Sequence, residues 1–556
     1  MKLIVIVLYL AAVVGVGLAA RRGRLAGPAD FFLAGRTFGP LVLVATMAAT
    51  NFSAFTVVGF AGAGYRMGFA FYPVMGFGTA FMALSFLLIG LPVWRLGARY
   101  GLITPPELVS TRYGSRALGV VFGTAMAVFT LPYLAIQPLA AGYALESTLG
   151  LPHAIGGALV TALVVSYCLV GGVRSVAWTD VLQGILMFAA LSLSFVAVAR
   201  ASGGMEAGLT TLAEKSPEHF MRPGAGGGMA LGIWASYMLL WLLADPMFPQ
   251  LFQRFYAARD QRAIVRTAVV YPFITTALFF LPVAIGVLGR LHVPGLEGSE
   301  TDRILPMVVE RFGGTWLSGL VSAGLVAAIM STMDSQLLTL GSIVERDLIG
   351  RRPVEPSAGS GPARNRLLPT RLSLAALAVI GYLLSLRPPA TILAVATEAF
   401  GGLAVLIPSV VAALWWKRAT APASIASIVA GEAWIALAHF GLVPSFGLLA
   451  AIPAVALASL VLAAGSLITR RVEGAGREWA GLASPGLSRR GCFGWAVVFA
   501  AFLALSVDWW RFGQPPSLVL GLPSWVAYFV VLALLLAVAF DSFGRHLLLR
   551  SPRPER

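Results

Sequence analysis

The chain has 556 residues, of which 58% are hydrophobic and only 12% charged. Soluble proteins are typically about 45–50% apolar and about 25% charged, so this composition excludes a soluble fold and predicts a protein that crosses a membrane many times. The net charge of +16 implies no nucleic-acid partner, because Lys and Arg gather in the cytoplasmic loops of membrane proteins. Two distant cysteines and five scattered histidines exclude a disulfide framework and make a zinc site an unfavoured reading.

Apolar stretches of about 20 residues, long enough to cross a bilayer as a helix, recur along the whole chain. Only Lys2 precedes the first stretch while four arginines follow it, which favours a retained helix over a signal peptide. Segment 353–364 has the composition of a flexible linker, and no loop is long enough for a soluble catalytic domain. About fifteen membrane spans are expected, near 3–20, 39–65, 70–94, 117–146, 154–172, 179–199, 229–251, 264–289, 315–344, 371–387, 392–415, 421–440, 446–469, 493–510 and 523–541.

Basic residues gather in alternate loops between these spans. The loop after the seventh span is counted as basic because of Arg254, Arg259 and Arg262, whereas the stretches 200–222 and 290–311 are near neutral. Since every odd-numbered span ends on a basic side, the sequence predicts an N-terminus outside the cell and a cytoplasmic C-terminus.

The second span, 39–65, has polar residues and glycines in its middle. Asn51 and Ser53 compete for backbone hydrogen bonds, and Gly59 and Gly62 weaken a helix further. This composition is typical of a discontinuous helix, whose freed carbonyl groups can hold a cation. The alternative is a polar patch that joins neighbouring helices by hydrogen bonds.

The ninth span, 315–344, carries the most informative polar cluster. Ser331, Asp334 and Ser335 fall on one helix face, beside Thr332. Hydroxyl and carboxylate oxygens suit a small hard cation, although a structural hydrogen bond of Asp334 would also explain the cluster. Asp180 opens the sixth span after Thr179, where a helix cap is the ordinary interpretation.

Further polar groups lie at membrane depth in other spans. Asp245 precedes Pro246 in the seventh span, where proline breaks or kinks a helix. Tyr133 and Gln137 lie in the fourth span, and Glu398 lies in the eleventh. For each of these side chains, contact with a ligand and a structural hydrogen bond are alternative explanations.

Several segments together resemble the sodium/solute symporter family, in one order and spacing from about residue 3 to residue 470. The resemblance implies two inverted five-helix repeats, at 39–200 and 229–416, within an all-α polytopic membrane protein. An N-terminal helix and loop at 1–38, two further helices at 417–470 and an added helix pair with a tail at 471–556 would flank them. The segments that carry the resemblance are 30–36, 50–54, 101–107, 171–183, 249–255 and 327–338.

The same resemblance implies binding residues for sodium and for the solute. Relatives with a second sodium site carry a hydroxyl where Asp334 stands, and the proline-type carriers have an aromatic residue where Asp245 stands. The main sodium site would use the backbone carbonyls of Ala49, Phe52 and Ala328 with the hydroxyls of Ser331 and Thr332, and a second site would use Asp180, Asp334 and Ser335. The substrate zone would contain Asn51, Ser53, Thr56, Tyr133, Gln137, Trp241 and Asp245.

The expected function is sodium-driven import of a small polar solute, such as an amino acid, a carboxylate or an amine, across the cell membrane. The expected protein works as a monomer in the bilayer and is not an enzyme, since no nucleotide motif or catalytic constellation is present. Proton coupling is the first alternative, because Asp180, Asp245, Asp334 and Glu398 would suffice for a proton relay. A channel or a transport-like sensor is the second.

Overall fold

The computed structural model describes residues 1–20, 28–350, 368–387, 390–470, 477–484 and 486–550. The linker expected at 353–364 lies outside these residues. Apart from one two-stranded hairpin, the regular elements in the described ranges are helices. In the hairpin, β1 (Leu518–Val519) pairs antiparallel with β2 (Leu522–Pro523), with Leu518 opposite Pro523 and Val519 opposite Leu522.

The helices follow one another with short connections. The first half of the chain forms α1 (Lys2–Ala20), α2 (Pro28–Leu33), α3 (Pro40–Asn51), α4 (Phe60–Met67), α5 (Phe71–Met82), α6 (Leu91–Tyr100), α7 (Pro105–Tyr113), α8 (Arg116–Leu149), α9 (His153–Ala201), α10 (Met205–Lys215), α11 (Leu231–Ala244), α12 (Pro249–Ala257) and α13 (Gln261–Gly289). The second half forms α14 (Ile304–Phe312), α15 (Gly314–Ile343), α17 (Leu368–Ser385), α18 (Ile392–Val405), α19 (Ile407–Trp415), α20 (Ala421–His439), α21 (Ala451–Ile468), α22 (Arg477–Ala483), α23 (Arg489–Val507) and α24 (Ser524–Arg550).

Eleven of the described helices are long and apolar enough to cross a membrane, and the bent pair α11–α12 makes a twelfth if it is counted as one span. Three shorter apolar helices lie at Lys2–Gly17, Pro40–Asn51 and His153–Leu169. The chain is therefore a multi-pass α-helical membrane protein. The count of about fifteen spans stays a prediction.

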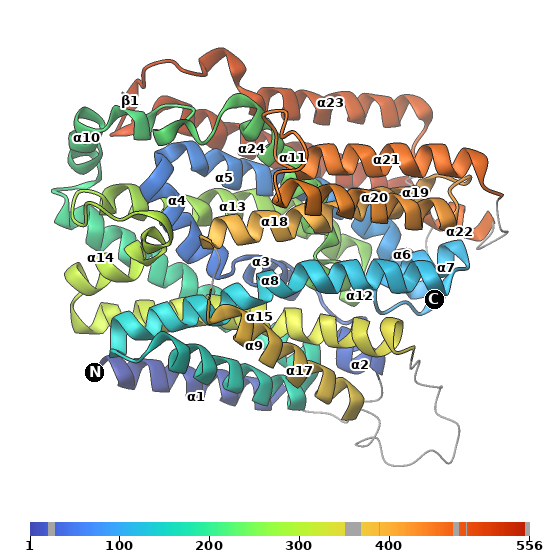
Figure 1. Cartoon of the computed structure of the whole chain (residues 1–556), viewed down its shortest axis with the longest axis horizontal. Helices are drawn as coiled ribbons and strands as arrows, with labels where there is room; N and C mark the ends of the chain where they lie inside the picture. The colour runs from blue at the N-terminus through green and yellow to red at the C-terminus, as the bar shows by residue number, and fades with distance from the viewer. Residues whose placement is uncertain (21–27, 351–367, 388–389, 471–476, 485, 551–556) are drawn as a thin grey trace.

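The helices lie side by side along the long axis of the molecule (Figure 1). The N-terminus, α10 and α14 lie at one end of the bundle, whereas α6, α7 and α22 lie at the other (Figure 1). The two near-neutral stretches that contain α10 and α14 thus lie at the same end as the N-terminus (Figure 1). Which end faces the cytoplasm stays a prediction.

Burial separates central helices from peripheral ones. The most apolar 18-residue stretch is 94% buried in Phe55–Tyr100 and 83% buried in Gly314–Leu348. The corresponding stretch of Arg489–Arg511 is only 17% buried. The centre of the bundle therefore consists of the second span, its successor and α15, which packs against α8 and α9. Of the last helix pair, α24 packs on α13 and α5, so the added segment covers the central helices directly.

The helix-cap interpretation of Asp180 is wrong. The sixth span begins earlier than expected, since α9 runs from His153 to Ala201 through a kink at Gly172 (φ 60°, ψ −166°). A side chain at Gly172 would lie 2.7 Å from the carbonyl oxygen of Phe31, so the kink needs glycine. Asp180 lies eight residues beyond the kink, inside helix, and its completely buried side chain points to other helices.

Candidate sodium and solute site

The predicted break in the second span is present in the structure. The helix α3 ends at Asn51, Phe52 has non-helical dihedral angles (φ −89°, ψ 84°), and helix resumes at Phe55. Two side chains satisfy the interrupted backbone, because Phe55 N–H donates to Ser53 Oγ (3.1 Å) and Ala54 N–H donates to Gln137 Oε1 (3.2 Å). Side-chain hydrogen bonds thus stabilise the break, and α8 contributes one of them through Gln137.

The polar stretch of α15 lies directly against this break. The Ser331 hydroxyl donates to the carbonyls of Ala49 (2.9 Å) and Ala328 (3.0 Å), and the Thr332 hydroxyl donates to the carbonyl of Thr50 (3.0 Å). Both hydroxyl-bearing residues are buried. Oxygens of three of the five residues expected at the main sodium site, Ala49, Ala328 and Ser331, are therefore in contact. The Thr332 hydroxyl contacts the neighbouring Thr50 carbonyl, and Phe52 lies at the break itself.

The residues expected at a second sodium site also come together, but around an arginine. Asp180 Oδ2 accepts hydrogen bonds from Thr46 Oγ1 (2.5 Å) and from Arg254 (3.1 Å), and the same guanidinium group donates to Ser335 Oγ (2.7 Å). Asp334 accepts from the Tyr167 hydroxyl (2.7 Å) and from Ser335 Oγ (3.1 Å).

Arg254 was counted among loop arginines, and this interpretation is wrong. It lies in α12 with 5% of its surface exposed, because the bend at Phe248 turns α12 into the bundle. The sequence analysis also missed Tyr167, because the sequence does not show which buried residue a tyrosine in an apolar span will contact. Arg254 lies in segment 249–255, which carries part of the family resemblance. This is the one feature of the sequence that indicated a role for Arg254.

A small cavity of about 10 Å³, close to the space of a single water molecule, lies next to the break. Five of the seven expected substrate residues line it, namely Asn51, Thr56, Tyr133, Trp241 and Asp245. The other two lie behind this lining, where Ser53 Oγ accepts from the Tyr133 hydroxyl (2.9 Å) and Gln137 Nε2 donates to the Tyr133 carbonyl (3.1 Å). The lining residues that the sequence did not suggest are Phe55, Met75, Thr79, Phe248, Phe279 and Phe400.

The polar groups of the cavity are only partly satisfied by protein. Asn51 Nδ2 donates to the Tyr271 hydroxyl (2.8 Å), and the Asn51 side chain also hydrogen-bonds to Asp245. In the described part of the chain, Asp245 Oδ1, Trp241 Nε1 and Thr79 Oγ1 are buried without a hydrogen-bond partner. Buried polar atoms normally have partners, so these three are open to hydrogen bonds from water or a polar solute.

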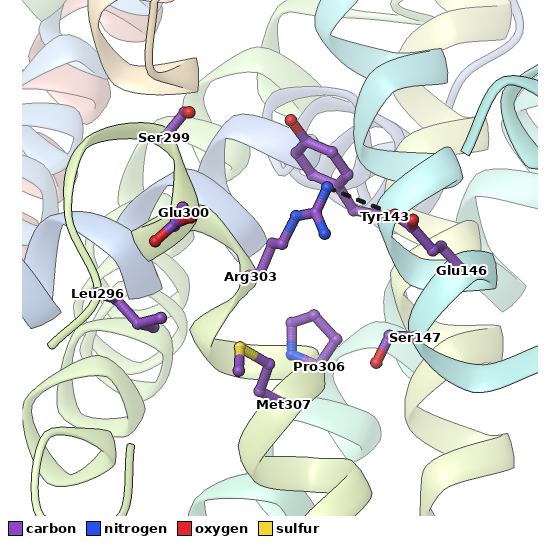
Figure 2. Close-up of a pocket in the computed structure, with 9 residues that line it drawn as sticks. All are labelled: Tyr143, Glu146, Ser147, Leu296, Ser299, Glu300, Arg303, Pro306 and Met307. Carbon is purple, nitrogen blue, oxygen red and sulfur yellow. Dashed lines mark ion pairs between the residues drawn. The ribbon is translucent and has the colours of Figure 1, made fainter. Parts of the chain in front are cut away.

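A second pocket lies at the bundle end that carries α14 and shares no residue with this cavity. Figure 2 shows Arg303 pointing between Tyr143 and Glu146 there. Arg303 lies 3.4 Å from the Glu146 carboxylate and 4.6 Å from the Tyr143 ring centre. The side chains of Arg303 and Glu146 are more than one-third exposed, so this pocket is an open surface feature and not part of the buried site.

Close to that pocket, Asp302 joins three segments. Its carboxylate accepts from the Ile392 N–H at the start of α18 (2.9 Å) and lies 3.5 Å from the Arg66 guanidinium of α4. Thr301 also accepts a hydrogen bond from Arg66. Burial raises the pKa of the Asp302 carboxyl to about 6, although the Ile392 N–H and Arg66 oppose the rise. Asp302 therefore links α4 and the start of α18 to the segment before α14.

The sodium:solute symporter family model matches residues 31–431. The chain belongs to the sodium:solute symporter family. Family members are sodium-coupled solute transporters of membranes, so sodium is the coupling ion and the protein is not an enzyme. The resemblance noted in the sequence is confirmed.

Individual relatives agree with the family assignment. The chain is 27% identical over 433 residues to the sodium/pantothenate symporter of Escherichia coli K12, covering 77% of this chain and 88% of the relative. It is 29% identical over 454 residues to the osmoregulated proline transporter of Bacillus subtilis 168, covering 80% of this chain and 90% of the relative.

Two solved structures show the same fold. A sodium-coupled sialic acid symporter in a substrate-bound outward-open state matches with a TM-score of 0.70 at 18% identity, covering 85% of this chain and 99% of the other. A nucleobase-cation-symport-1 family transporter matches with a TM-score of 0.58 at 12% identity, covering 83% and 99%.

Proposed function

We propose that this symporter imports a small polar organic solute with sodium across the cell membrane, by alternating access around the break between α3 and α4. Sodium would bind the carbonyl oxygens of Ala49, Phe52 and Ala328 and the hydroxyls of Ser331 and Thr332. The observation that carries the proposal is the pair of hydrogen bonds from Ser331 to Ala49 and from Thr332 to Thr50. Hydroxyl and carbonyl oxygens are hard ligands of the kind that sodium prefers, which supports the proposal.

The break couples the ion to the solute. Ala49 and Thr50 face α15, while Asn51 and Thr56, on either side of the same break, line the cavity. An ion that fixes the carbonyl side of the break therefore also orders the solute side. Coupling requires that both ligands favour the same state, and one shared segment meets this requirement.

The architecture proposed for this mechanism is two inverted repeats at 39–200 and 229–416. Support comes from the position of the two interrupted spans. The first span of each proposed repeat is broken, at Phe52 in one and by the 57° bend between α11 and α12 in the other. Inverted-repeat transporters place paired broken helices of this kind around the site. In the same proposal the spans number about fifteen, the N-terminus is outside, the C-terminus is cytoplasmic and the monomer is the working unit.

The sodium gradient supplies sufficient energy for accumulation. One charge that crosses 100 mV releases about 2.3 kcal/mol, which supports roughly 50-fold accumulation per sodium before the concentration gradient is counted.

A second sodium at Asp180, Asp334 and Ser335 would have to share its place with the Arg254 guanidinium, which already contacts Asp180 and Ser335. We therefore propose a cycle with one sodium, in which Arg254 supplies the positive charge at this position. A sodium titration should then give a Hill coefficient close to one. A coefficient near two would show that a second sodium binds there.

The experiment that tests the main site compares wild type with the Ser331→Ala/Thr332→Ala double variant, both purified and reconstituted. Sodium should raise the thermal transition of wild type and not that of the double variant, measured against potassium. Ser194→Ala is the matched control, because the Ser194 hydroxyl also donates to a carbonyl of its own helix but lies on α9 away from the break. Equal sodium stabilisation of double variant and wild type would contradict the proposal.

A further inference from the structure

We propose that the solute carried by this symporter bears an ammonium group, and that Asp245 together with the surrounding aromatic rings binds it. This inference deepens the proposed function and rests on it. The structural basis is a buried carboxylate that lacks a positive partner inside an aromatic cavity.

Other buried acids of the bundle have either hydroxyl or arginine partners. Asp334 accepts hydrogen bonds from Tyr167 and Ser335, and Glu345 accepts one from Thr370. The carboxylates of Asp180, Glu107, Asp508 and Asp302 each lie within 3.5 Å of an arginine. Asp245 is 2% exposed, and none of the ion pairs among the described residues includes it. Among the described residues the Asn51 amide is the hydrogen-bond partner of its carboxylate, and the Oδ1 atom has no partner. A buried carboxylate in this position is stabilised by a cation that arrives with the ligand.

The backbone aims this carboxylate into the cavity. Asp245 begins a short 3-10 helix, Asp245–Met247, between α11 and α12, and the chain bends by 57° at this point. Trp241 lies four residues earlier, so the two side chains share one helix face and both line the cavity. Trp241 Nε1 is buried without a partner as well.

The cavity walls are aromatic and in mutual contact. The Phe400 ring centre lies 4.9 Å from that of Tyr133, 4.7 Å from that of Phe248 and 5.6 Å from that of Trp241. The Phe55 ring lies 6.1 Å from Trp241. Cations are attracted to the faces of such rings, most strongly to tryptophan, and aromatic cages are a recurrent means of binding alkylated ammonium groups.

The lining also argues against a solute that carries only negative charge. Among the described residues the lining contains no Arg, Lys or His, so none of these side chains is available to pair with a carboxylate of the solute. The ionised form of Asp245 would also repel an anionic solute in this apolar environment.

The test measures thermal stabilisation of the purified full chain in sodium and in potassium, with choline, ethanolamine and tetramethylammonium as cationic probes. The neutral isostere of choline, 3,3-dimethylbutanol, and pantothenate serve as the uncharged and anionic comparisons. At least one cationic probe should bind in a sodium-dependent manner, at least tenfold more tightly than the isostere and pantothenate. Binding of the isostere or of pantothenate at equal or higher affinity would overturn the inference, with no variant needed.

Variants then assign the effect to Asp245. Asp245→Asn should weaken the cation at least tenfold and leave the isostere unchanged, while Asp245→Glu should keep part of the affinity. Glu398→Gln is the matched control, because Glu398 lies on the same helix as Phe400 but is exposed and paired with His439. Loss of cation binding in the control, or full cation binding in Asp245→Asn, would overturn the assignment.

A separate measurement keeps this inference apart from the proposed function. Sodium alone should stabilise Asp245→Asn as well as wild type, because the sodium ligands lie on the other side of the break. If wild type shows no response to sodium, the proposed function fails; if it responds to sodium but prefers uncharged or anionic solutes, only the ammonium inference fails. Sodium-independent, pH-driven uptake that requires Asp245 would assign this carboxylate to protons and would also overturn the inference.

Discussion

The hydroxyl of Thr332 donates a 3.0 Å hydrogen bond to the carbonyl of Thr50, which precedes it by 282 residues. Thr50 belongs to the last turn of α3, whose final carbonyls have no partner within the helix. The Thr332 hydroxyl therefore satisfies a carbonyl that the helix break leaves without a partner in its own helix. This contact shows why the break and the hydroxyl pair of α15 form one site.

Arg254 and Asp180 should stabilise the fold together, so that losing one partner costs more than replacing both. Arg254→Gln leaves the buried Asp180 carboxylate without its charged partner, and we expect a loss of about 3–5 kcal/mol. The double variant Arg254→Gln/Asp180→Asn should recover much of this loss, because no uncompensated charge remains. Thermal unfolding in detergent measures both effects.

The control for this pair is the exposed ion pair between Arg545 and Asp541 on α24. Arg545→Gln should change stability by less than about 1 kcal/mol, since exposed pairs contribute little. A double variant at Arg254 and Asp180 that is no more stable than Arg254→Gln alone would show that the arginine acts by packing and not by charge.

Asp302 should make the contact between α4, the segment before α14 and α18 sensitive to pH. Its pKa is raised to about 6 from an ordinary value of 3.8 when it is buried in this contact. The buried form therefore holds its proton more tightly than an exposed form. Protonation favours the closed contact fully below about pH 3.8, and the advantage, at most about 3 kcal/mol, is lost as the pH rises to about 6.

Hydrogen exchange of residues 290–311 measures this effect. Protection should be greater at pH 5 than at pH 7.5, after correction for the intrinsic exchange rate. Asp302→Asn should show the same protection at both values, because it cannot titrate. A variant that keeps the pH dependence of wild type would assign the effect to another group, such as His292 or His219.

Gln137 should support the break through one hydrogen bond to Ala54 N–H. Gln137→Leu removes this acceptor and leaves a buried N–H unsatisfied, at a cost of about 1–3 kcal/mol. Since the break carries carbonyl groups that we propose to bind sodium, we expect sodium affinity to fall by about tenfold or more while the fold is kept. Gln137→Glu retains the acceptor, so it should bind sodium better than Gln137→Leu, and the opposite order would contradict this role.

Two glycines allow α4 and α13 to pack backbone to backbone. A side chain at Gly286 would lie 1.9 Å from the carbonyl oxygen of Ala61, and one at Gly64 would lie 2.4 Å from that of Val283. Gly286→Ala should therefore destabilise the protein by about 1–3 kcal/mol through overpacking. Gly15→Ala on α1 meets nothing within 4 Å and should leave the thermal transition unchanged. An unchanged transition in Gly286→Ala would show that the two helices separate without cost.

The sequence by itself determined that the chain is a multi-pass helical membrane protein, because apolar runs and their interruptions are local properties. The break near Asn51 and Ser53 and the bend at Pro246 and Pro249 were predicted in this way, since polar residues and prolines weaken a helix wherever it packs. The motif segments likewise pointed to the family that the comparisons show.

Only the tertiary structure decided which side chains meet across the bundle. It placed Arg254 beside Asp180 inside the protein, although the charge pattern had assigned this arginine to a loop. It also brought Phe400 against Trp241 and left Asp245 without a cation in the described ranges. These outcomes depend on the direction in which a bent helix enters the bundle, which long-range packing fixes and local composition does not encode.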